Sequence, residues 1–288
     1  MKLKTGIVLL LLSAAALFSF RTQQKPPNAL GLILSIDKDS IAHAAGFKMI
    51  GESVGKMLSP SLNEEKFRSN IERINKAQCK VYMCNILFPS SMKIAGPAVN
   101  TPRVLAYVDS VFLRAEQANI KHIILGSGGS RRLPDGYDTK KAQADFTLLC
   151  GKLALVAQKH HIMLVLESLE TAETNFLLTL KETAEVVRAV NNPNFKLNAD
   201  IYHMGRMKET PQVIVDNADI IVHCEIAELE IRTLPGMKGD DLKPYLRALR
   251  TANYKGPIFM EPGAPYTAAD AAMSFKFLTR QLEEVYAE

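Results

Sequence analysis

Short apolar runs alternate with longer amphipathic stretches from residue 30 to the C-terminus. Eight runs have the length and composition of buried strands, at 30–36, 49–54, 81–88, 122–125, 163–167, 196–200, 219–226 and 257–261. Apolar residues recur at helical spacing between them, over 64–77, 103–117, 141–160, 180–190, 242–251 and 268–285. Apolar strands separated by amphipathic helices are typical of a parallel sheet covered by crossover helices.

The number of strand and helix units indicates how this sheet closes. Eight strands, most of them followed by a helix, predict a single α/β domain, a (β/α)₈ TIM barrel over 28–288. An open, doubly wound sheet would be favoured by a glycine-rich turn after the first strand, but Ser35-Ile36-Asp37-Lys38 stands there. The helices after the first strand and after Asp200 are expected to be short.

The N-terminus precedes this pattern and has a different character. Lys2 and Lys4 are followed by an apolar run over 7–20 and then by polar residues and two prolines. This arrangement predicts a signal peptide or N-terminal anchor at 1–25, and hence an exported, periplasmic protein that is membrane-anchored if the signal is not cleaved. The run is shorter than the roughly 20 residues that span a bilayer, so no stable membrane span is expected after processing.

Charge and cysteine content narrow the choice of partners. The formal net charge is +5, but basic and acidic residues are interspersed, so no nucleic acid partner is expected; an oligomer remains possible. The spacing of the four cysteines matches no zinc motif. Most of them lie in apolar strand or helix patterns, which favours buried thiols over disulfides.

Candidate chemistry lies at the ends of the last four predicted strands. Glu167 ends the fifth, Asp200 ends the sixth, His223 and Glu225 lie in the seventh, and Glu261 ends the eighth. Because the active sites of such barrels form at the carboxyl ends of the strands, these side chains are expected to converge. Converging carboxylates repel one another unless a cation neutralises them, and an oxygen-rich set with one nitrogen suits Mn²⁺, Mg²⁺ or Co²⁺.

Four segments of the chain resemble motifs of one barrel superfamily. Residues 167–175 resemble an E-x-L-x-x-x-E-x-N segment, and Asp200 to His203 resembles D-x-x-H. Residues 232–236 resemble R-x-x-P-G, and Glu261-Pro262 resembles a terminal E-P. These motifs are similar to those of the sugar phosphate isomerase/epimerase family and the ketose 3-epimerases, within the xylose isomerase-like TIM barrel superfamily.

The resemblance implies roles for individual residues. It implies that Glu167, Asp200 and Glu261 bind a divalent metal, with Mn²⁺ expected first and Mg²⁺, Co²⁺ or Zn²⁺ as alternatives. In the seventh strand the superfamily often has H-x-H, whereas this chain has His223-Cys224-Glu225. His223 is preferred as the fourth ligand for its imidazole, and Glu225 is the alternative. The residues expected to bind substrate are Glu173, His203 and Arg232.

The function implied by this resemblance is proton transfer on a small carbohydrate. Glu167 and Glu261 are expected to be the catalytic carboxylates of a metal-dependent isomerase or epimerase that acts through an enediolate. One alternative is a lyase or hydrolase that acts on a 3-oxo-glycoside through the same metal-enolate chemistry. A second alternative is a barrel that binds sugar without turning it over.

Overall fold

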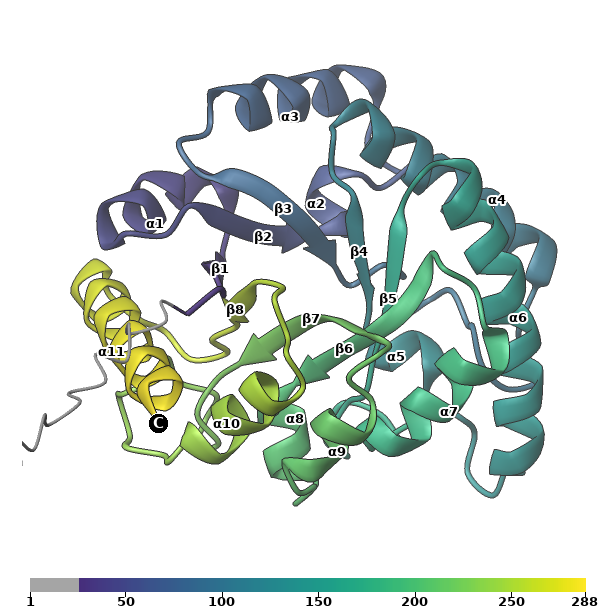
Figure 1. Cartoon of the computed structure of the whole chain (residues 1–288). Helices are drawn as coiled ribbons and strands as arrows, with labels where there is room; N and C mark the ends of the chain where they lie inside the picture. The colour runs from purple at the N-terminus through teal and green to yellow at the C-terminus, as the bar shows by residue number, and fades with distance from the viewer. Residues whose placement is uncertain (1–25) are drawn as a thin grey trace, which may run out of the picture.

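A computed structural model describes residues 26–288, so the signal peptide or anchor predicted at 1–25 lies outside the described residues. Eight parallel strands form a closed barrel in chain order, with helices on its outside (Figure 1). The predicted (β/α)₈ barrel is therefore confirmed. The strands are β1 Leu30–Ile33, β2 Met49–Ser53, β3 Lys80–Asn85, β4 His122–Leu125, β5 Met163–Glu167, β6 Phe195–Asp200, β7 Ile221–Ile226 and β8 Ile258–Met260.

The long helices follow the predicted amphipathic stretches. They are α3 Glu64–Lys76, α4 Thr101–Gln117, α6 Thr139–Lys159, α7 Leu180–Val190, α10 Lys243–Thr251 and α11 Ala268–Ala287. Short helices complete the connections: η1 Ile36–Lys38, α1 Asp39–Ala45, α2 Val54–Met57, α5 Gly128–Arg131, α8 Ile201–Arg206 and α9 Gln212–Asp216. The helices after β1 and β6 are short, as expected. In the described part of the chain, no helix is long and apolar enough to cross a bilayer.

Several strands end earlier than the apolar runs that predicted them. The first run continues to residue 36, but β1 ends at Ile33 and a turn of 3₁₀-helix begins at Ile36. The third run continues to 88, but β3 ends at Asn85 because Ile86 has a left-handed backbone with φ of 53°. The eighth strand ends at Met260. As a result Asn85 and Glu261 lie at the rim of the barrel, at the ends of their strands.

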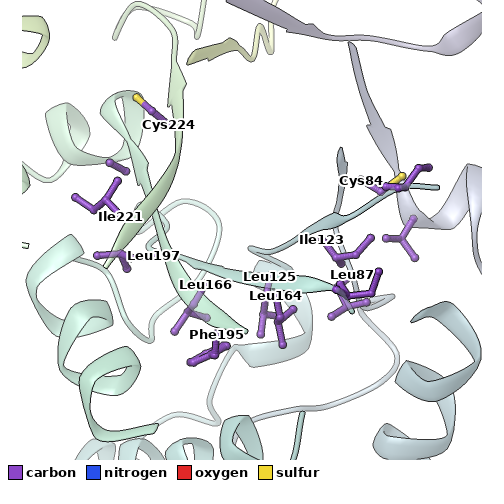
Figure 2. Packing of buried hydrophobic residues seen from close by; sticks show 14 of the residues in the cluster. Cys84, Leu87, Ile123, Leu125, Leu164, Leu166, Phe195, Leu197, Ile221 and Cys224 are labelled. Atoms are coloured by element: carbon purple, nitrogen blue, oxygen red, sulfur yellow. The ribbon is translucent and has the colours of Figure 1, made fainter. Parts of the chain in front are cut away.

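Side chains alternate between the outer and inner face along each strand, and this forms two apolar layers. Outward-facing side chains such as Leu125, Leu166 and Leu197 pack in the layer between strands and helices (Figure 2). A smaller cluster of Met83, Ile124, Val165 and Phe259 fills the barrel itself. All four cysteines are buried with free thiols, which confirms the predicted burial. Alternate residues of a strand face the same side of the sheet. The inward-facing residues that follow this inner cluster along each strand therefore lie at the rim.

Candidate active site

Four carboxylates from four consecutive strands meet at the rim. Glu167 and Asp200 are the last residues of β5 and β6, Glu225 lies one residue before the end of β7, and Glu261 directly follows β8. One oxygen of each lies within 4.8 Å of one oxygen of every other. We call these four residues the carboxylate cluster. Three of them are almost completely buried, and the side chain of Glu261 is 19% exposed.

The register of β6 and β7 places Glu225, and not His223, in this cluster. Asp200 is paired with Glu225, whereas His223 is paired with Asn198, two residues earlier on the same inner face. The His223 ring lies deeper in the barrel, 5.2 Å from the ring of Phe259, with Nε2 3.3 Å from Oε1 of Glu225. The side-chain positions therefore favour Glu225, the alternative, over His223, the residue preferred from the sequence.

Two amides that sequence analysis missed hold the cluster. The Asn198 side-chain nitrogen lies 3.3 Å from Oε1 of Glu167 and 2.6 Å from Oε2 of Glu225. Asn85, at the end of β3, donates to Oε1 of Glu261 at 2.8 Å. A signal for Asn198 was present, since it lies two residues before Asp200 and therefore on the same face. Both amides orient carboxylates without adding charge to a site that already carries four acidic groups.

Arg232 reaches across the rim from the connection after β7. Its guanidinium donates to Oδ2 of Asp200 at 3.2 Å, to Oε1 of Glu173 at 3.1 Å and to Oε2 of Glu261. It also lies over the ring of Tyr202, at 4.6 Å from the centroid. The structure thus brings Arg232 together with Glu173 and two of the four clustered carboxylates. Among the described residues, Arg232 is the cationic side chain that donates hydrogen bonds to the clustered carboxylates.

His203 presents one ring nitrogen to the same space. Its Nδ1 accepts a hydrogen bond from the backbone N–H of Glu170 at 3.2 Å, which assigns the proton of the neutral ring to Nε2. This Nε2 lies 3.5 Å from Oδ2 of Asp200 and 3.7 Å from Oε1 of Glu173, without a hydrogen-bond partner among the described residues. Burial lowers the pKa of His203, so the neutral ring can donate from Nε2.

Burial and mutual repulsion shift the pKa values of the cluster. Burial, followed by the neighbouring carboxylates, raises the pKa of Glu167 well above its ordinary value. Burial and the repulsion from Glu225 raise the pKa of Glu261 in the same way. Burial and Asp200 raise the pKa of Glu225 to about 7. Burial also acts to raise the pKa of Asp200, but His203 and Arg232 outweigh it and the net pKa shift is downward. The positive charge around the cluster does not balance its four carboxyl groups, which are good ligands for a cation.

Close packing beneath Glu167 fixes its position. A Cβ at Gly126 would collide with Oε2 of Glu167, so a side chain there would displace this carboxylate from its position. Arg131, which is fully buried, donates from Nη1 to the backbone oxygen of Glu167 at 2.6 Å. Burial lowers the pKa of Arg131 to about 10, although the carboxylates of Glu167 and Glu173 oppose the shift. Arg131 therefore belongs to the interior of the protein.

Glu228 anchors the connection that carries Arg232, and sequence analysis did not single it out. Its fully buried carboxylate accepts hydrogen bonds from the hydroxyl of Thr233 and from the backbone N–H groups of residues 236, 238, 239 and 240. Its own backbone N–H donates to the oxygen of Thr233 at 2.9 Å. The Glu228 side chain therefore ties the start of the loop, before Arg232, to residues 233–240 after it.

Replacing Glu228 with glutamine should loosen this loop. Hydrogen bonds to a charged group contribute about 1.5–3 kcal/mol each, and the amide of Gln cannot accept all five. We expect Glu228→Gln to lower the free energy of unfolding by about 2–3 kcal/mol in urea titrations. Glu230→Gln is the matched control, because Glu230 lies in the same loop and its side chain is 67% exposed. Equal stability of the two variants would show that Glu228 does not anchor the loop.

Comparison with known proteins agrees with this architecture. The family model of the xylose isomerase-like TIM barrel matches residues 40–281. A ketose 3-epimerase of Arthrobacter globiformis is 29% identical over 113 residues, which are 38% of this chain and 38% of that protein. The matched part thus spans well under half the length of this relative.

Solved structures share the fold over most of the chain. An L-ribulose 3-epimerase superposes with a TM-score of 0.77 at 17% identity and covers 90% of this chain and 95% of that one. A 3-keto-D-glucoside 4-epimerase from E. coli superposes with a TM-score of 0.72 at 18% identity and covers 88% and 99% of the two chains. Given the family match over residues 40–281, the protein belongs to the xylose isomerase-like TIM barrel family.

Proposed function

We propose that this protein is a metal-dependent carbohydrate epimerase or isomerase that transfers a proton between the two faces of a carbon next to a carbonyl. The observation that carries the proposal is the carboxylate cluster, with the guanidinium of Arg232 and the imidazole N–H of His203 beside it. The epimerases named above support it, since they share the fold. The predicted signal at 1–25 leads us to propose further that it acts after export, in the periplasm, on an unphosphorylated sugar.

The residues of the cluster fit a divalent cation. Four carboxylate oxygens lie within 4.8 Å of one another in a buried setting, and three of the four have a raised pKa. Glu167, Asp200, Glu225 and Glu261 would hold the ion. An all-oxygen set suits hard cations, so we propose Mn²⁺ first, with Mg²⁺ next and the softer Zn²⁺ less suited. His203 lies near Glu167 and Asp200, but its Nε2 carries the proton of the neutral ring and is left to donate a hydrogen bond.

The chain's own residues can then carry the chemistry. When bound, a divalent cation supplies a Lewis acid that polarises the carbonyl and stabilises developing negative charge. One carboxylate of the pair Glu167 and Glu261 removes a proton from the carbon beside the carbonyl, and the electron pair moves into the enediolate of the sugar. The other residue of the pair enters the reaction protonated, as its raised pKa allows, and gives its proton to the same carbon from the opposite face, which inverts the carbon. His203 can donate to a sugar oxygen, while Glu173 and Arg232 bind hydroxyls.

Metal content and solvent exchange test this proposal together. We expect the purified protein to hold close to one divalent ion per chain and to incorporate deuterium from D₂O into a ketose or a 3-oxo-glycoside. Dialysis against a chelator should abolish the exchange, and Mn²⁺ should restore it. The readouts are elemental analysis and the ¹H NMR spectrum of the sugar.

Other outcomes would contradict the proposal in recognisable ways. Exchange that is undiminished after complete metal removal would exclude the metal-dependent mechanism. Release of the group attached to the sugar, without inversion, would identify elimination and the lyase alternative. Metal binding and exchange that are both absent would leave the barrel that only binds sugar.

A further inference from the structure

A hollow of about 770 Å³ opens on the same face of the barrel as the carboxylate cluster. It lies between the segment 53–61 after β2, the loop 86–92 after β3 and the first half of α4. Both segments begin at the carboxyl ends of strands, which is the end of the barrel where the cluster lies. The volume is within the range of about 300–1,000 Å³ that is typical of small-molecule sites.

The inner edge of the hollow is connected to the cluster through β3. Ile86 lines the hollow and directly follows Asn85, whose side chain donates to Oε1 of Glu261 at 2.8 Å. Ile86 is 53% exposed and has φ of 53°, an unfavourable conformation for a β-branched residue. Such strain costs on the order of 1–3 kcal/mol and tends to occur at ligand sites. Ile86 therefore presents an exposed apolar side chain to the hollow, one residue beyond the Asn85 that contacts the cluster.

The lining combines hydroxyl groups with aromatic rings. Serine hydroxyls come from both connecting segments and from α4, and they can donate or accept hydrogen bonds. The partly buried ring of Tyr107 provides apolar surface between the hydroxyls, and the buried ring of Phe88 packs behind it at 5.7 Å. Arg103 is the one charged side chain among the lining residues, and it is exposed. A neutral ligand with hydroxyls at its edges and C–H groups on its faces, such as a sugar ring, matches this lining.

We propose that this hollow binds the second sugar ring of a two-ring glycoside whose reacting ring lies at the carboxylate cluster. The inference rests on the proposed function for the position of the reacting ring. It adds that a glycoside of two rings is the preferred substrate over a single sugar. Asn85 and Ile86 are adjacent in the chain, and one contacts the cluster while the other lines the hollow on the same face of the barrel.

A bulky residue in the hollow tests the inference. Ala106 lines the hollow on α4, so Ala106→Trp should fill part of it. Leu113→Trp is the matched control, because Leu113 lies on the same helix, is 46% exposed and is not a lining residue. Suitable substrates are methyl 3-oxo-β-D-glucoside and 3-oxo-cellobiose, which share the reacting ring and differ in the second ring. The quantity measured is the ratio of their KM values in deuterium exchange.

We expect the wild-type protein to prefer the two-ring substrate by at least about tenfold in KM, the size of effect that about 1.4 kcal/mol of added binding produces. Ala106→Trp should reduce this ratio to near one, and Leu113→Trp should retain it. A ratio near one in the wild type, or equal ratios in the two variants, overturns the inference while the proposed function stands. If neither substrate exchanges and the ketoses do not exchange either, the proposed function fails. The second-ring site is then tested by calorimetric titration of cellobiose and of glucose into the three proteins, and the ratio of the two Kd values replaces the ratio of KM values.

Discussion

Replacing Glu261 with glutamine is expected to slow deuterium exchange about a thousandfold, the middle of the range for loss of a general acid or base. The amide of Gln preserves size and can still accept from Asn85, which donates to Oε1 of Glu261. It cannot take up a proton from carbon at neutral pH. Glu167→Gln should have an effect of similar size, because the proposed mechanism needs one carboxylate on each face of the sugar.

Glu173→Gln provides the internal comparison. Glu173 contacts Arg232 and lies near His203, but its side chain is 39% exposed and it stands outside the carboxylate cluster. We expect this variant mainly to raise KM by about tenfold, with a small effect on kcat, because it removes binding and not proton transfer. Metal content should be measured for all three variants. Exchange above a tenth of the wild-type rate in Glu261→Gln, with metal still bound, would remove Glu261 from the proposed pair.

The sequence was informative wherever strand alternation and chain order decide the structure. The eight apolar runs predict the barrel, and acidic residues at the ends of the fifth, sixth and eighth runs predict three members of the cluster. Both inferences need only the rule that inward-facing residues recur at every second position and end at one rim. Boundaries were less certain, because an apolar run such as 81–88 does not reveal that Ile86 leaves the strand with a left-handed backbone.

The choice between His223 and Glu225 shows where sequence reasoning ended. Both residues face the barrel interior, so periodicity cannot separate them. The choice depends on the register between β6 and β7, which shifts between Leu197 and Asn198 and pairs Asp200 with Glu225. An irregularity of this kind carries no glycine or proline signal in the chain. Glu228 was missed for a related reason, since its hydrogen bonds go to backbone groups of a loop whose path the sequence does not specify.

The raised pKa of Glu225 gives the stability of the metal-free protein a defined dependence on pH. The pKa of Glu225 is about 7 in the folded protein, against 4.5 for an ordinary glutamate carboxyl. Between these two pH values the folded protein therefore keeps a proton that the unfolded chain has released. The resulting stabilisation is complete below the reference pKa and is lost as pH rises through about 7. Above that pH the ionised Glu225 costs about 3 kcal/mol relative to a neutral residue.

Glu225→Gln removes this contribution together with the repulsion that Glu225 exerts on Glu167 and Glu261, whereas His122, His203 and His223 are common to both proteins. Their lowered pKa values act with the opposite sign, since stability is lost as pH falls below the ordinary histidine pKa, and the effect cancels in the difference. In urea titrations with a chelator, the variant should be more stable than the wild type at pH 8, by up to about 3 kcal/mol, and should lose this advantage at pH 5.

Adding Mn²⁺ at pH 8 should reverse the order of the two proteins. Ligand carboxylates must be ionised, so metal affinity rises with pH, and a bound ion stabilises the folded state by mass action. The wild type offers four carboxylates to the ion and the variant offers three, so the wild type should gain more. A variant that is less stable than the wild type at pH 8 without metal would show that Glu225 is not held in an electrostatically unfavourable position. A variant that gains as much from Mn²⁺ would exclude Glu225 as the seventh-strand ligand.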